Sequence, residues 1–212
     1  DQAYEEAGAR VASADEVRAC RVVVKVRAPT DDAKAGAGYR DSAASSFKAG
    51  SLLISLLSPA DNGELIEKLA AAKVDALALE RIPRISRAQK MDVLSSMGNI
   101  AGYRAVLEAA VAYEGFFGAS VTAAGTIPPA KVLIIGAGVA GLQAIAAARA
   151  LGAEVRAFDV RPACAEQVES LGAKFLMLDF DESGEGEGGY AKIMSKEFID
   201  AEMALFADQA KE

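Results

Sequence analysis

The apolar residues of the chain follow two kinds of pattern in turn. Some segments are short apolar runs typical of strands, and others space their apolar residues three or four apart, as helices do. Three β-prone apolar runs predict strands of a parallel sheet: residues 21–29, 51–59 and 74–83. Pro29 ends the first run, which is continuous enough to predict a buried strand. Between the other two runs, Leu65, Ile66 and Leu69 share one side of an amphipathic helix expected at 60–73. Strand, helix and strand in this order predict a βαβ unit.

Less regular segments flank this unit. Residues 1–9 are expected to be helical, and residues 30–50, rich in Ala, Gly, Ser and Asp, indicate an exposed connection with a structural role. A long helix is predicted at 91–117, and the double proline within 122–131 ends its pattern. The apolar residues near helical spacing in the long helix are Leu94, Met97, Ile100, Ala101, Val106 and Leu107.

The second half of the chain repeats the alternation. Its predicted elements are a strand at 132–135, an alanine-rich helix, a strand ending at Asp159, a helix at 163–172, a strand at 174–179 and a helix at 195–212. We therefore predict an α/β fold of two Rossmann-like, doubly wound domains, residues 1–120 and 121–212, joined by the long helix. A nucleotide-binding sheet normally has further strands, so we expect the second domain to be incomplete in this chain.

The composition narrows the function classes. The 212 residues are 52% hydrophobic and carry a formal net charge of −7, which argues against nucleic acid as the main partner. The chain has no histidine, which removes the commonest general base and most zinc sites, and we expect no metal site. Cys20 and Cys164 are isolated and are expected to be buried, inert thiols. We expect a soluble chain, since no apolar stretch reaches bilayer length and no signal peptide follows Asp1.

Three glycines carry the strongest motif. Gly136, Gly138 and Gly141 have G-x-G-x-x-G spacing, directly after a branched strand and at the start of the alanine-rich helix. The first glycine allows a tight turn, the second lets a pyrophosphate approach the backbone, and the third lets helix and strand pack closely. The helix N-terminus adds free N–H groups and a positive dipole end. In this context the motif predicts a dinucleotide site rather than a plain strand-to-helix turn.

An acidic residue, Asp159, and a positively charged one, Arg161, follow the motif. Asp159 ends the next strand, where its carboxylate would accept hydrogen bonds from the adenosine ribose and repel a 2′-phosphate. Arg161 could instead favour a phosphorylated ribose, but we expect NAD(H) as the cofactor of this site. The residues expected to bind it here are Gly136, Ala137, Gly138, Val139, Gly141, Asp159, Val160 and Arg161.

Two polar segments complete the candidate chemistry. Residues 81–99, "RIPRISRAQKMDVLSSMGN", crowd hydrogen-bonding side chains into one connection, and a solvated loop is the plain alternative to a binding strip. Residues 181–192 combine glycines and acids around Tyr190. Composition alone leaves two interpretations of this tyrosine open: a lid residue over bound nucleotide, or the first packing residue after a flexible linker.

Residues 84–108, 122–176 and 188–212 closely resemble the NAD(H)-binding domain I of proton-translocating NAD(P) transhydrogenase. The resemblance covers most of the chain, and residues 30–47 are the clearest departure from it. It implies that Tyr190 lies on a mobile loop and joins the cofactor-binding residues.

The resemblance also gives roles to the polar strip. It implies that Arg84, Asp92 and Ser95 hold the carboxamide and nearby ribose of the nicotinamide end, while Gln89 bridges toward a second nucleotide. Hydride transfer needs the two nicotinamide carbons roughly 3 to 3.5 Å apart, so polar groups must fix both rings. Direct transfer from NADH to NADP⁺ moves no proton through a side chain, which fits a chain without histidine.

The same resemblance implies partners that this chain does not contain. NADP(H) would bind on a separate domain III, protons would cross a membrane domain II, and the chain would form a homodimer. It would then be a soluble peripheral domain of an inner-membrane enzyme, on the mitochondrial matrix side or the bacterial cytoplasmic side. No direct membrane insertion by this chain is expected.

Two other functions stay open. Alanine dehydrogenases belong to the same fold family and use a lysine and a histidine in the substrate cleft; Lys25 matches the lysine, but the histidine has no counterpart in residues 51–59. A non-catalytic NAD(H)-sensing module would use the glycines and Asp159 without passing on a hydride. The transhydrogenase component is the function we predict.

Overall fold

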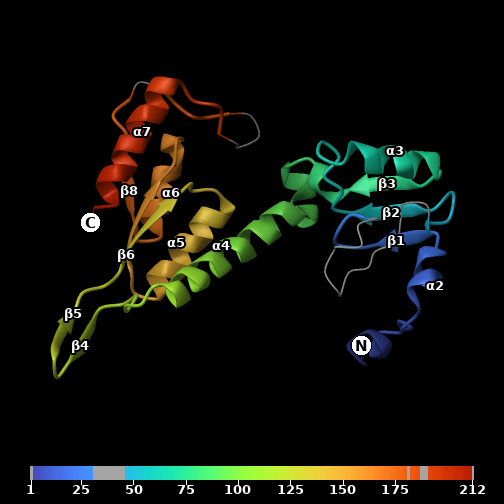
Figure 1. The fold of residues 1–212 in the computed structure, drawn as a ribbon, viewed down its shortest axis with the longest axis horizontal. Coiled ribbons are helices and arrows are strands. Elements are labelled where there is room, and N and C mark those ends of the chain that lie inside the picture. Colours follow the sequence, from blue (N-terminus) through green and yellow to red (C-terminus); the bar gives the residue numbers. More distant parts are fainter. Residues whose placement is uncertain (1, 31–45, 181, 187–190, 212) are drawn as a thin grey trace. The chain divides into compact units, whose positions relative to one another are not determined.

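The computed structural model describes residues 2–30, 46–180, 182–186 and 191–211 (Figure 1). The chain divides into two compact units, Asp1–Val93 and Leu94–Glu212, which are described separately. The first unit contains α1 (Gln2–Glu6), α2 (Ala14–Arg18), β1 (Val22–Val24), β2 (Leu52–Ser55), α3 (Gly63–Ala71), β3 (Asp75–Ala78) and 3-10 helices at Leu79–Arg81 and Ser86–Met91. The second contains α4 (Val93–Ala112, starting at the boundary), β4 (Ser120–Thr122), β5 (Gly125–Ile127), β6 (Lys131–Ile135), α5 (Val139–Ala150), β7 (Glu154–Phe158), a 3-10 turn at Pro162–Cys164, α6 (Ala165–Ser170), β8 (Lys174–Leu176) and α7 (Lys196–Gln209).

A three-stranded parallel sheet organises the first unit, in the order β1-β2-β3. The predicted βαβ unit is confirmed, because α3 connects β2 to its parallel neighbour β3 and buries Leu69. The prediction of a long, buried first strand was wrong: β1 covers three residues, and Val22 and Val24 are exposed on either side of buried Val23. The face of β1 that carries Val22 and Val24 is therefore exposed.

The core of the first unit contains a residue that the sequence pattern did not single out. Phe47 is 6% exposed and packs with Val23, Leu53, Leu57 and Leu69, although it comes from the segment expected to be an exposed connection. Most of that segment, residues 31–45, lies outside the described residues. Its end thus supplies an aromatic ring to the core.

A second parallel sheet, in the order β6-β7-β8, organises the other unit. The connections between its strands contain α5 and α6, which is the arrangement of the first half of a Rossmann fold and confirms the predicted α/β class. The main core is rich in alanine, with Ala148, Ala153 and Ala157 fully buried. A second cluster brings α7 to the sheet, where Phe158 and Phe206 meet edge to face with ring centroids 5.2 Å apart.

Helix α4 is shorter than the predicted 91–117 and packs through its smallest residue. A Cβ atom at Gly102 would lie 2.0 Å from the carbonyl oxygen of Ala140, so the backbones of α4 and α5 are in direct contact. Of the apolar residues noted near helical spacing, Val106 is buried, whereas Met97 and Ile100 are about half exposed. These contacts assign α4 to the second unit; domain bounds of 1–120 and 121–212 stay a prediction.

An antiparallel hairpin, β4 and β5, precedes the second sheet, where the sequence predicted only a break. Val121 on this hairpin is 82% exposed. Among the described residues, none of the helices combines the length and the apolar character needed to cross a membrane.

Candidate functional site

The glycine motif forms the tight turn between β6 and α5. Gly136 has φ +96°, a left-handed conformation that favours glycine, and its N–H donates to the carbonyl of Phe158 at 2.7 Å. A Cβ atom at Gly141 would lie 1.7 Å from the carbonyl oxygen of Gly136. A Cβ atom at Gly138 would meet nothing within 4 Å. The first and third glycines therefore build the turn, while the second faces open space.

That open space lies at the N-terminus of α5. Gly138 caps the helix with an extended backbone, and the first turn of any helix leaves N–H groups without partners inside the helix. Val139, the first helical residue, is 37% exposed. Unpaired N–H groups and a positive dipole end give this surface the chemistry to bind an anion.

Asp159 joins β7 to the glycine turn. Its side chain is 6% exposed, and its Oδ2 accepts a hydrogen bond from the N–H of Ala137 at 2.7 Å. Arg161 donates three more hydrogen bonds: its backbone N–H and Nε to Oδ1 at 2.9 and 2.8 Å, and one Nη to Oδ2 at 2.9 Å. The structure therefore brings Ala137, Asp159 and Arg161 together at the glycine turn, and their binding of a cofactor stays a prediction.

These contacts set the charges at the site. Burial alone would raise the pKa of the Asp159 carboxyl, but the hydrogen bonds from Arg161 and Ala137 outweigh it and hold the pKa below its ordinary value of 3.8. The same pairing raises the pKa of Arg161 above its ordinary value. The carboxylate is consequently ionised at neutral pH and fixed in one orientation.

The two cysteines differ from each other. Cys164 is buried as predicted, and burial, followed by the negative charge of Asp159, raises the pKa of its thiol. A raised pKa leaves little thiolate, so Cys164 behaves as a small apolar residue. The prediction for Cys20 was wrong, because this thiol is exposed near the end of α2, where its Sγ lies 3.5 Å from the carbonyl oxygen of Glu16.

The glycine-rich acidic segment contributes one contact that sequence reasoning missed. The N–H of Gly184 donates to the carbonyl of Val160 at 2.9 Å, and a Cβ atom there would lie 2.3 Å from the Val160 side chain. Glycine within 182–186 is thus required for close approach to the residue after Asp159, a role that its glycine content hinted at. Tyr190, expected to bind cofactor, lies outside the described residues.

The polar strip lies at the end of the first unit. Arg84 and Asp92 form an ion pair, with Nε and Oδ2 3.4 Å apart, across the 3-10 helix Ser86–Met91. Buried Ala88 anchors this helix, and Gln89 is exposed on it. Ser95 follows in the first turn of α4, as part of the second unit. The strip is therefore structured by local contacts and is not a simple solvated loop.

Glu80 is a further polar residue that the sequence did not single out. Its carboxylate accepts hydrogen bonds from the backbone N–H of Leu57, at 3.0 and 3.2 Å, and from that of Ser58. Ser58 has φ 46°, unusual for a residue other than glycine. Glu80 thus fixes the sharp turn by which the chain leaves β2.

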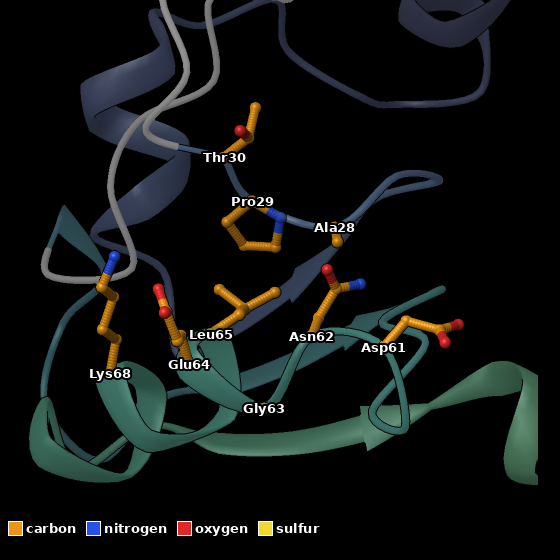
Figure 2. A pocket seen from close by; sticks show the side chains of 9 residues that line it. All are labelled: Ala28, Pro29, Thr30, Asp61, Asn62, Gly63, Glu64, Leu65 and Lys68. Carbon is orange, nitrogen blue, oxygen red and sulfur yellow. The ribbon is translucent and has the colours of Figure 1, made fainter.

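The first unit also contains a cavity of about 480 Å³ at the amino end of α3 (Figure 2). Side chains of Asn62, Glu64 and Lys68 rise from the helix and its start toward Pro29 and Thr30. The cavity is lined by none of the residues expected to bind nucleotide. Among the described residues, no group of histidine, cysteine and acidic side chains is arranged to hold a metal ion.

Comparison with protein families and curated proteins gives consistent matches. Residues 1–101 match the model for the N-terminal domain of alanine dehydrogenase/PNT, and residues 105–212 match that for the C-terminal domain. The NAD(P) transhydrogenase subunit alpha of Haemophilus influenzae aligns with all of this chain at 52% sequence identity, and the alignment covers 40% of that protein. The NAD(P) transhydrogenase subunit alpha of Cereibacter sphaeroides also aligns with all of this chain, at 49% identity and over 39% of that protein. The chain thus spans less than half the length of these relatives.

Solved structures agree with these matches. The crystal structure of transhydrogenase from Sinorhizobium meliloti is similar with a TM-score of 0.75 and 50% identity, over 84% of this chain and 50% of that chain. A structure of L-alanine dehydrogenase is similar with a TM-score of 0.64 and 28% identity, over 82% of this chain and 47% of that chain. Both similarities extend over most of the chain.

Proposed function

The chain belongs to the alanine dehydrogenase/PNT family, and from this premise we propose that it forms the NAD(H)-binding part of a proton-translocating NAD(P) transhydrogenase. One observation carries the nucleotide assignment: the N–H of Ala137, within the glycine turn, donates to the carboxylate of Asp159 at 2.7 Å. This contact sets an anion-binding helix end beside a buried acid, the two groups that a dinucleotide needs for its pyrophosphate and its ribose.

Each residue of the glycine turn has a task in this proposal. The pyrophosphate lies against Gly138 and accepts hydrogen bonds from N–H groups at the start of α5, near Val139. Gly136 and Gly141 keep strand and helix close enough for this approach. Asp159 accepts hydrogen bonds from the adenosine ribose. Val160, Arg161 and Tyr190 border the adenosine and complete the proposed binding set.

The polar strip is proposed to hold the redox end of the cofactor. Arg84, Asp92 and Ser95 bind the carboxamide and nearby ribose, and the Arg84–Asp92 ion pair, at 3.4 Å, keeps both side chains in a defined orientation. We assign to exposed Gln89 a bridging role, in which its amide would reach toward the NADP(H) of the partner domain. The dihydronicotinamide, when bound, supplies the hydride that NADP⁺ accepts. The side chains then only orient the rings, since no proton has to move.

The remaining steps of the reaction belong to the rest of the enzyme. We assign NADP(H) to a separate domain III and proton translocation to a membrane domain II, and we propose that this chain acts as a homodimer. Its place would be a peripheral one on the matrix or bacterial cytoplasmic side of an inner membrane. The names of the relatives, which describe an alpha subunit, support an enzyme of several subunits or domains.

Two measurements test the proposal. Calorimetry on the full-length protein is expected to detect NADH binding, and mixing with an isolated NADP(H)-binding domain is expected to give hydride exchange between the bound nucleotides. Absence of NADH binding would defeat the proposal, whereas binding without exchange would favour an NAD(H)-sensing module. NADH oxidation that depends on pyruvate and ammonia would favour alanine dehydrogenase activity, for which Lys25 next to β1 is the matching residue.

A further inference from the structure

The carboxylate of Asp159 has no hydrogen-bonding capacity left. An ionised carboxylate offers about four acceptor sites. Two of the four hydrogen bonds at Asp159 come from backbone N–H groups, those of Ala137 and Arg161, at 2.7 and 2.9 Å. The other two come from the Arg161 guanidinium, at 2.8 and 2.9 Å. A ribose hydroxyl that binds this acid must therefore replace one of the guanidinium donors, because the backbone donors are fixed by the fold.

The pairing also occupies Arg161. Bidentate recognition of a phosphate uses the planar fork of an arginine, and the fork of Arg161 is already matched to the two oxygens of Asp159. With 17% of its side chain exposed, Arg161 lies at the rim of the site. A guanidinium held in this way has no fork to offer to a second anion.

We propose that Asp159 selects between the two nicotinamide dinucleotides by holding Arg161, the residue that would otherwise bind a 2′-phosphate. This inference rests on the proposed binding of NAD(H). An unphosphorylated ribose brings two hydroxyl donors, which replace the two donors of the guanidinium one for one. A 2′-phosphorylated ribose brings one hydroxyl and an anion, so the exchange would leave a buried carboxylate short of a donor and next to a second negative charge.

The arginine is thus a phosphate-binding group that its neighbouring acid keeps masked. The presence of Arg161 does not make the site favour NADP(H), and removal of the Asp159 charge is expected to do so. In Asp159→Asn the side-chain amide keeps one oxygen acceptor but directs N–H groups at other donors, which releases the guanidinium. Asp159→Ser serves as a second variant, since it removes the fork partner with a smaller side chain.

Adenosine fragments isolate the 2′-phosphate from the rest of the cofactor. Calorimetry on the full-length protein would compare AMP with adenosine 2′,5′-bisphosphate in the parent, Asp159→Asn, Arg161→Ala and the double variant. The parent is expected to favour AMP. The Asn variant should shift the affinity ratio toward the bisphosphate by about 100-fold, whereas the double variant, relieved only of repulsion, should shift it by about tenfold. Arg161→Ala alone should show about the same preference for AMP over the bisphosphate as the parent, because a masked guanidinium adds nothing to phosphate binding.

Controls separate this inference from the proposed function. Arg104→Ala removes one positive charge from an exposed position on α4, in the same unit, and should leave the ratio unchanged. Equal shifts in the Asn variant and the double variant would overturn the inference, because Arg161 would then contribute nothing. A much stronger preference for AMP in Arg161→Ala than in the parent would also overturn the inference, because the guanidinium would then already have been binding the 2′-phosphate. A folded parent protein that bound neither NADH nor AMP would instead defeat the proposed function itself.

Discussion

Two alanine substitutions in the glycine turn should affect different properties of the protein. Alanine at Gly141 should destabilise the fold, whereas alanine at Gly138 should leave the fold stable and weaken NADH binding. In Gly141→Ala the new methyl group would lie 1.7 Å from the Gly136 carbonyl oxygen, about half the distance of an ordinary contact, and the atom that it meets belongs to the backbone. Overpacking of this kind costs about 3 kcal/mol, the upper end of the usual range, because no flexible side chain can move aside. In Gly138→Ala the methyl group meets nothing within 4 Å.

The backbone conformation supports the same contrast. Gly138 has φ −78° and ψ −168°, which any residue adopts, so alanine gains by restricting the unfolded chain and loses a little as a helix cap. The net change in the free energy of unfolding should stay within about 1 kcal/mol. At about 3 to 5 °C per kcal/mol, Gly141→Ala should lower the melting temperature by about 10 °C and Gly138→Ala by a few degrees at most.

For NADH binding, Gly138 should matter more than its small effect on stability suggests. If the pyrophosphate lies against Gly138, a methyl group there should weaken NADH binding by about 10- to 100-fold while the fold stays intact. Thermal unfolding and calorimetric titration of the full-length variants would measure both quantities. Normal NADH affinity in a stable Gly138→Ala protein would refute the placement of the pyrophosphate. A fully stable Gly141→Ala protein would refute the close packing of strand and helix.

Three further predictions follow from other contacts. Gln89→Asn should slow hydride exchange with an NADP(H)-binding domain far more than it weakens NADH binding, and equal stopped-flow rates in variant and parent would exclude ring alignment by this amide. Because the folded-state pKa of Asp159 is lowered, its stabilising contribution is fully present above pH 3.8 and is lost as the pH falls through the folded-state pKa; Asp159→Asn should flatten acid unfolding curves in that window. Glu80→Ala should destabilise the first unit by about 2 to 3 kcal/mol in denaturant titrations, since buried Leu57 and its neighbour Ser58 would lose a charged acceptor, and Glu80→Gln should retain some of this stabilisation.

The glycine turn and the position of Asp159 beside it were predictable because these residues are close in sequence and obey local rules. Gly136 needs a positive φ, Gly141 needs close contact, and Asp159 ends the neighbouring strand, so spacing alone brings them together. The network around Asp159 was not predictable in detail. The sequence left the effect of Arg161 open, because whether a guanidinium pairs with the acid or faces the ribose depends on rotamers that spacing does not define.

The first unit shows where sequence patterns fail. Phe47 lies in a segment of small and polar residues, so no periodicity identifies it as core, yet it is 6% exposed. Gly102, in the second unit, has no apolar side chain to contribute to a pattern, yet it brings the backbones of α4 and α5 into contact. Conversely, Val22 and Val24 belong to a continuous apolar run that matches a strand buried on both faces, but they are exposed, because the run does not tell whether other elements cover both faces.

The interpretation of Asp159 shows how hydrogen-bond counting adds to a motif. By spacing alone, an acid at this position favours NAD(H) and a nearby arginine favours NADP(H), and the two rules conflict at Asp159 and Arg161. With all four acceptor sites of the acid filled, the two residues act as one group of nearly zero net charge. The affinity of a ligand that separates the two side chains then depends on how many hydrogen-bond donors it supplies to the carboxylate in place of the guanidinium. Two ribose hydroxyls restore both donors, whereas a 2′-phosphorylated ribose restores only one and adds a negative charge, so the conflict between the two rules disappears.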